Sequence, residues 1–240
     1  MRSVFLIAGN FVREQRWVVA AWVAMALGFA GIIAGVGGKP NPEDVGMYLS
    51  QQALYAVGLG VFLAASAIHN ERKSRRILAV LSKSVRRSQY VAGLLSGIFL
   101  CSILHCLSIA LAGSWMAARM ELPLEHAWIS AGLMLAAAAL AASVTMFWST
   151  FSGPLGAAIG ASALMGAPVV AARHLGEEWL RSLPVYWLST TAVALPTQPA
   201  WEIPWEVPWA VLALAAAEVL AFWMAAALIF ARRDVTAALE

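Results

Sequence analysis

The chain has 240 residues, of which 61% are apolar (Ala, Val, Ile, Leu, Met, Phe, Trp, Tyr or Cys) and only 12% are charged. Soluble proteins carry about 45–50% apolar and about 25% charged residues, so these side chains cannot form a water-facing surface. Disorder, a collagen-like structure and nucleic-acid binding are excluded on the same grounds. The net charge is only +3, so the positions of the charges are more informative than their sum.

Apolar runs long enough to cross a bilayer occur six times along the chain. A transmembrane helix needs about 20 apolar residues. Such runs must be helical because lipid offers no partners for backbone N–H and C=O groups. The predicted spans are Trp17–Val36, Gln52–His69, Tyr90–Ala117, Trp128–Ser149, Pro154–Ala172 and Trp209–Phe230. The expected fold is therefore an all-α membrane protein whose single transmembrane domain covers residues 1–240.

The segment before the first span, residues 1–16, has its own pattern. Its apolar stretch Val4–Gly9 is too short for a signal peptide, so the first span is expected to stay in the mature protein. An amphipathic helix lying in the membrane interface is predicted here, and an ordinary basic flank is the alternative. The apolar face of this helix would comprise Val4, Phe5, Ala8, Phe11 and Val12, with Arg2, Arg13 and Arg16 off it.

The distribution of lysine and arginine predicts the orientation of the spans. With the N-terminus in the cytoplasm, 12 of the 16 basic residues fall on the inside. The four outside are Lys39, Arg119, Arg173 and Arg181. Cytoplasmic loops of membrane proteins carry the excess of Lys and Arg. We therefore expect both termini inside, in a multi-pass protein of the inner (cytoplasmic) membrane.

Two connections between the predicted spans are longer than simple turns. Asn70–Gln89 is basic and lies on the predicted cytoplasmic side, whereas Arg173–Pro208 lies on the outside. Within the second connection, Val185–Leu195 is apolar but too short to cross a bilayer. This stretch is expected to form an external helix or a shallow re-entrant element.

A nucleotide-binding motif is incomplete in this sequence. Gly38-Lys39 resembles the end of a phosphate-binding loop, but that motif needs a glycine where Ile33 stands and a hydroxyl where Pro40 stands. The chain is therefore expected to bind neither ATP nor another cofactor, and no catalytic residue is predicted.

Few polar side chains lie deep inside the predicted spans. Glu218 is the one carboxylate there, and it is either a substrate-cavity or gating residue or a structural hydrogen-bonding group. His105 shares a helical face with Cys101, and Cys106 follows it. Cysteine and histidine can bind soft metals, but one helix supplies too few ligands. No metal site is predicted, and the cysteines are expected to pack as small apolar residues.

The basic connection after span two also carries a helical pattern. Ile77, Leu81 and Val85 recur at positions i, i+4 and i+8, with basic residues between them. This spacing predicts a short amphipathic helix at the cytoplasmic surface. A helix of this kind can dock into a groove of a soluble partner.

This connection resembles that of the permease subunits of type 2 ATP-binding-cassette (ABC) transporters. In that family an acidic residue follows span two, then come a Gly-Thr-like step, a leucine-rich turn, Pro-x-Ser-Arg and Gly-Lys. The matching positions are Glu71, then Ile77, Leu78 and Leu81, then Val85, Arg87 and Gly93. Arg75, Ser84 and Leu94 replace the usual Gly, Pro and Lys. The ending Phe230-Ala231-Arg232-Arg233-Asp234 is also similar to the Phe-x-Arg-Arg-Asp common in the family.

The resemblance implies the membrane half of an exporter. Two copies of the chain would pair and bind two copies of a cytoplasmic ABC ATPase subunit, which would hold the ATP and magnesium. The coupling helix between spans two and three would contact the ATPase, and the turn Ser149–Gly153 would add a smaller contact. The residues implied in ATPase contact are Glu71, Ile77, Leu78, Leu81, Val85, Arg86 and Arg87, with the two arginines as charge partners.

The substrate class and two rival functions remain open at this stage. The spans are aliphatic and aromatic, which fits a lipid-like or amphiphilic substrate better than a sugar. One rival is an intramembrane enzyme that uses His105 or Glu218. The other is a membrane scaffold that transports nothing.

Overall fold

The computed structural model describes residues 2–36, 41–73, 85–175, 184–197 and 207–232, and these ranges contain helices and turns but no strand. Six of the helices are long and apolar enough to cross a membrane. They are α1 (Arg2–Val36), α2 (Pro42–Lys73), α4 (Arg87–Ala118), α5 (Glu125–Ser149), α6 (Pro154–Leu175) and α9 (Val207–Arg232). For the described residues, the predicted all-α class with six helices long and apolar enough to cross a membrane is therefore confirmed.

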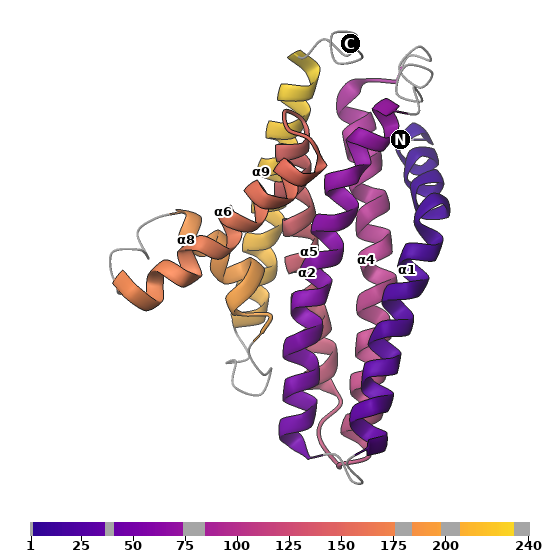
Figure 1. The fold of residues 1–240 in the computed structure, drawn as a ribbon, viewed down its shortest axis with the longest axis vertical. Helices are drawn as coiled ribbons and strands as arrows, with labels where there is room; N and C mark the ends of the chain where they lie inside the picture. Colours follow the sequence, from indigo (N-terminus) through magenta and orange to yellow (C-terminus); the bar gives the residue numbers. More distant parts are fainter. Residues whose placement is uncertain (1, 37–40, 74–84, 176–183, 198–206, 233–240) are drawn as a thin grey trace.

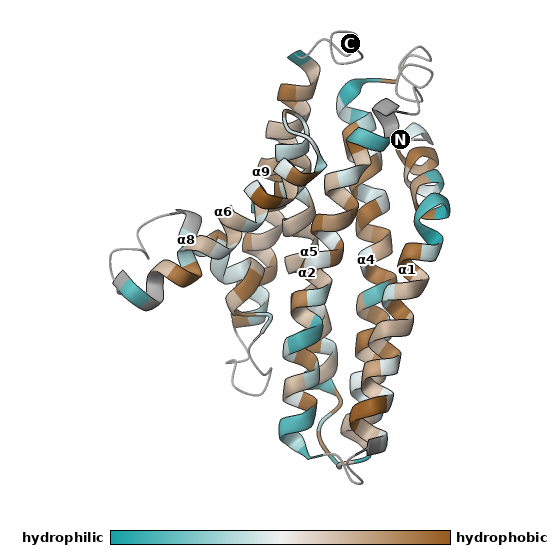
Figure 2. Ribbon diagram, viewed as in Figure 1, coloured by the Kyte–Doolittle hydropathy of each residue, from teal (hydrophilic) through white to brown (hydrophobic). Residues whose placement is uncertain are grey.

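Helices α1, α2, α4, α5 and α9 form an elongated bundle, and α6 runs obliquely away from it (Figure 1). The start of α1, the end of α2, the start of α4 and the end of α9 lie at the same end of this bundle. In Figure 2 the hydrophilic residues gather mainly toward the ends of the helices, and apolar residues fill most of the length between. This pattern suits helices that cross a bilayer, because polar side chains are costly in its hydrocarbon core.

Helix α1 differs from the prediction because it runs without interruption from Arg2 to Val36. The interfacial helix predicted for residues 1–16 is therefore wrong as a separate element. A Cβ added to Gly93 of α4 would lie 2.7 Å from the Ile7 Cβ, and one added to Gly97 would lie 2.9 Å from the Phe11 Cβ. The two glycines let the first half of α1 pack closely along α4, which holds it in line with the first span.

Helix α2 begins at Pro42, ten residues before the predicted start at Gln52. Its first turn is capped reciprocally: the Asp44 backbone N–H donates to Asn41 Oδ1 at 2.9 Å, and the Asn41 N–H donates to Asp44 Oδ2 at 2.8 Å. Proline at the first helical position suits this arrangement because its missing N–H needs no partner there. The hydropathy pattern missed this turn since its residues are polar.

The predicted element at Val185–Leu195 is helical, formed by α8 (Pro184–Ser189) and the π-helical turn η1 (Thr190–Ala194). Leu188 and Ala192 belong to a buried cluster with residues of α5 and α6. The α5 members of this cluster are Leu140, Ala141 and Val144. Because η1 also contacts α2 and α9, this element packs among the long helices and not on their outer surface alone.

Candidate functional site

The expected ATPase-contact residues lie in four different surroundings. Residues 74–84, with Ile77, Leu78 and Leu81, and the side chain of Glu71 lie outside what the structure describes. Val85 packs against the apolar cluster that holds Phe11, Tyr90 and Phe230. Arg86 is exposed, and its backbone N–H donates to Gln89 Oε1 at 3.3 Å.

Arg87 joins the first turn of α4 to the last turn of α9. Its Nη1 atom donates hydrogen bonds to the carbonyl oxygens of Phe230, at 3.2 Å, and Ala231, at 3.0 Å. The last carbonyls of a helix lack partners within the helix and carry partial negative charge, so a guanidinium stabilises them. Beside this contact the rings of Tyr90 and Phe230 stack, with centroids 6.4 Å apart and planes inclined by 16°.

The structure thus brings together two segments that carry the family resemblance, the start of α4 and the ending at Phe230. Sequence reasoning assigned Arg87 to the ATPase and missed its contact with α9. The two partners are more than 140 residues apart in the chain, and no local pattern pairs them. Only the arrangement of the helices reveals this link.

His105 is fully buried in α4. Its ring stands edge-on to Trp22 of α1, with centroids 5.8 Å apart. Within the described residues, neither ring nitrogen has a hydrogen-bond partner. Cys101 and Cys106 are buried free thiols. No group of three or more His, Cys, Asp or Glu side chains that could hold a metal ion is present in the described part.

Glu218 is partly buried on α9, and its Oε2 has no hydrogen-bond partner among the described residues. It is not among the residues that line the cavity described next. His105 and Glu218 do not form a hydrogen-bonded pair.

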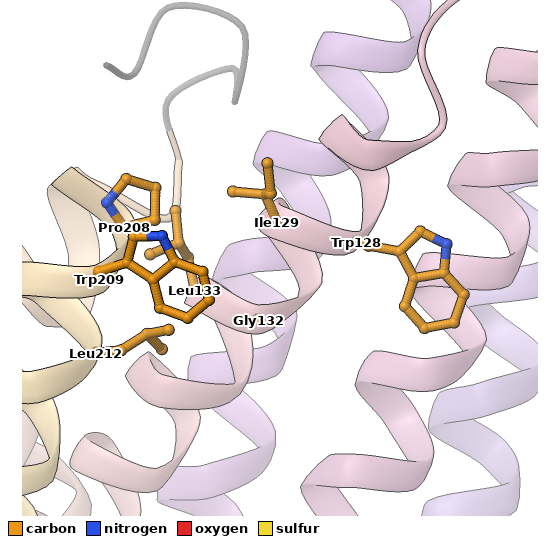
Figure 3. Close-up of a pocket in the computed structure, with 7 residues that line it drawn as sticks. All are labelled: Trp128, Ile129, Gly132, Leu133, Pro208, Trp209 and Leu212. Carbon is orange, nitrogen blue, oxygen red and sulfur yellow. The ribbon is translucent and has the colours of Figure 1, made fainter. Parts of the chain in front are cut away.

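An apolar groove runs between α4, α5 and α9. Its larger part is a cavity of about 490 Å³ in which Ser96 is the single polar lining residue. A second cavity of about 240 Å³ shares Gly132 and Leu212 with the first and reaches Trp128 and Trp209. Figure 3 shows the α9 residues of this second cavity opposite residues of α5.

The groove follows α5 from Trp128 to Ala142, which is about 21 Å at the rise of an α-helix. Small side chains on both facing helices make the room; they are Gly132, Ala136, Ala139, Ala142, Ala215 and Ala216. A groove with this lining can hold an apolar chain, and none of its lining side chains is acidic, basic or a thiol.

Comparison with protein-family models and with curated proteins gives no match for this chain. The resemblance to type 2 ABC permeases therefore rests on the motifs around Glu71–Gly93 and Phe230–Asp234 and on the layout of the spans.

Proposed function

We propose that the chain is the transmembrane subunit of an ABC exporter of the cytoplasmic membrane. Two copies pair, and each binds one copy of a separate ATPase subunit through the segment between α2 and α4. ATP and magnesium are held by the ATPase, and this chain performs no bond chemistry. The observation that carries the proposal is the Arg87 contact, which ties α9 to α4 directly after the basic segment.

The Arg87 contact suggests how movement of the ATPase subunit could change the substrate site. When the ATPase displaces residues 74–84, the start of α4 moves, and the Arg87 hydrogen bonds transmit that movement to the end of α9. These two helices and α5 form the apolar groove, so its shape changes when α4 and α9 shift together. Two packings with different affinity for the substrate are what an energy-driven transporter requires.

The groove also favours a substrate class. Its lining is apolar over about 21 Å, which suits the hydrocarbon part of a lipid-like or amphiphilic molecule. Its outer end carries indoles, which in membrane proteins sit at the level of the lipid headgroups. A lipid-like substrate could therefore enter this groove directly from the surrounding bilayer.

The enzyme alternative has less support from the described residues. Nucleophilic or acid–base catalysis needs a nucleophile and a base within hydrogen-bond reach. His105 packs against Trp22 in the core, and neither of its nitrogens has a hydrogen-bond partner, Glu218 included, in the described part of the chain. A pure scaffold would need neither the amphipathic segment nor the groove.

Co-purification tests the proposal. The chain solubilised from its native membrane should carry a stoichiometric subunit with a Walker A motif and ATPase activity. The double variant Ile77→Asp/Leu81→Asp should lose this subunit because two carboxylates would enter an apolar docking face. Val85 is left unchanged since it packs in the core. The control Arg119→Asp, at the opposite end of α4, should retain the subunit.

Either of two results contradicts the proposal. One is a chain that never carries an ATPase in mild detergent or in native-membrane nanodiscs. The other is a hydrolase activity of the isolated chain that is lost with His105→Ala or Glu218→Ala, which would favour the intramembrane enzyme.

A further inference from the structure

A line of aromatic and polar side chains joins α1, α2 and α4, and we call it the polar seam: Trp22, Tyr48, Gln52, Tyr55 and His105. Tyr48 Oη donates to the Ala26 carbonyl of α1 at 3.4 Å. The Tyr55 ring stands edge-on to Trp22, with centroids 6.2 Å apart. Trp22 meets the His105 ring of α4 in the same way. The seam therefore lies where these three helices meet.

Gln52 occupies the part of α2 between these two tyrosines. It is about 40° around the helix from Tyr48 and about 60° from Tyr55. Because both tyrosines contact α1, Gln52 belongs to the same side of α2. Its exposed fraction is 0%, so it faces the interior and not lipid.

The two most polar members of the seam have no protein partner in the described chain. His105 is also 0% exposed, and the unpartnered atoms are Gln52 Nε2 and Oε1 and His105 Nδ1 and Nε2. An amide carries two donors and an acceptor oxygen, and a neutral imidazole carries one donor and one acceptor. Burying these groups without hydrogen-bond partners costs the free energy of their hydration, with nothing to offset it. Two such residues in one seam therefore indicate a hydrogen-bonding ligand.

We propose that Gln52 and His105 bind ordered water, which makes the polar seam a hydrated site inside the membrane-spanning bundle. Water is the ligand that both donates and accepts, and buried water typically makes two to four hydrogen bonds to groups of this kind. An apolar ligand would leave all four atoms unsatisfied. A metal ion is disfavoured because Gln52 and His105 supply too few ligands.

The hydrated seam is separate from the apolar groove. His105 lies about 180° around α4 from Ser96, the polar residue of the groove. Helix α4 thus has an apolar face toward α5 and α9 and a hydrated face toward α1 and α2. The inference does not depend on the proposed function, since bound water is expected whether or not an ATPase drives the protein.

Radiolytic hydroxyl labelling of the whole chain in lipid nanodiscs, read by mass spectrometry, tests this inference. Radicals formed from bound water oxidise adjacent side chains even where bulk solvent is excluded. We expect oxidation of Trp22, Tyr48 and His105. Met165, which is 2% exposed in an apolar cluster, should stay unmodified although methionine is the more reactive residue.

The variant Gln52→Met tests whether the oxidation depends on water bound by Gln52. Methionine matches glutamine in length and lack of branching but cannot hydrogen-bond as an amide, so oxidation of Tyr48 should be lost. Three results overturn the inference: no oxidation of the seam in the unmodified chain, equal oxidation of Met165, or unchanged Tyr48 oxidation in Gln52→Met. The first two are decided on the unmodified chain, whether or not the variant folds.

Discussion

Replacing Gly60 by alanine should lower the free energy of unfolding by about 2 kcal/mol, the usual range for overpacking a tight helix contact. A Cβ at this position would lie 2.5 Å from the carbonyl oxygen of Ala138 and 3.3 Å from its carbon. Because the obstacle is backbone, no rotamer change relieves it, and α2 must move away from α5. These two helices pack closely along much of their length, so the displacement spreads through the bundle.

Denaturation by SDS in mixed micelles measures this effect. Gly31→Ala is the matched control, because Gly31 has no atom within 4 Å of an added Cβ and is exposed on α1. Alanine is the better helix former by up to about 1 kcal/mol, so the control should be neutral or slightly stabilising. Equal stability of Gly60→Ala and Gly31→Ala would mean that α2 and α5 are not in this close contact.

Removing the Arg87 guanidinium should release the end of α9. Hydrogen bonds to charged groups contribute about 1.5–3 kcal/mol when buried, and Arg87 is only partly buried, so Arg87→Gln should cost about 1 kcal/mol after solvent screening. Arg87→Lys should recover only part of this, because a compact ammonium does not match the fork of the guanidinium. Amides in the last turn of α9 should exchange hydrogen faster in both variants.

The effect of Arg87→Gln on transport should exceed its effect on stability. If α9 follows α4 through this contact, the variant should hydrolyse ATP with its ATPase subunit and move little substrate. Arg119→Gln, on an exposed side chain at the opposite end of α4, is the control and should behave as the unmodified protein. Unchanged transport and unchanged hydrogen exchange in the last turn of α9 would show that the Arg87 contact does not couple α4 to α9.

Hydropathy was sufficient to predict six long apolar helices, because lipid leaves a run of 20 apolar residues no other stable conformation. Helix ends depend on polar chemistry that hydropathy does not measure. The first turn of α2 shows this, since Asn41, Pro42 and Asp44 form a capping arrangement that could have been read from their spacing. A search for caps beside the apolar runs would have placed the start of α2 correctly.

Contacts between segments that are far apart in the chain could not be predicted from the sequence. The first half of α1 packs on Gly93 and Gly97 of α4, which leave room for Ile7 and Phe11. The role of Arg87 depends on where α9 ends. Of the polar seam, only His105 was predicted from the sequence as a buried polar residue, because Gln52 is uncharged and lies at the edge of a predicted span, and its burial follows from how the helices pack.

Photo-crosslinking from residue 81 in living cells tests the central claim most directly. A photoreactive amino acid in place of Leu81 should crosslink to an ATPase subunit with a Walker A motif, whereas the same amino acid in place of Lys39, on the predicted outer side, should not. Crosslinks from residue 81 to lipid alone would contradict an ATP-driven permease. So would the labelling of a cysteine at position 81 by a membrane-impermeant thiol reagent in intact cells.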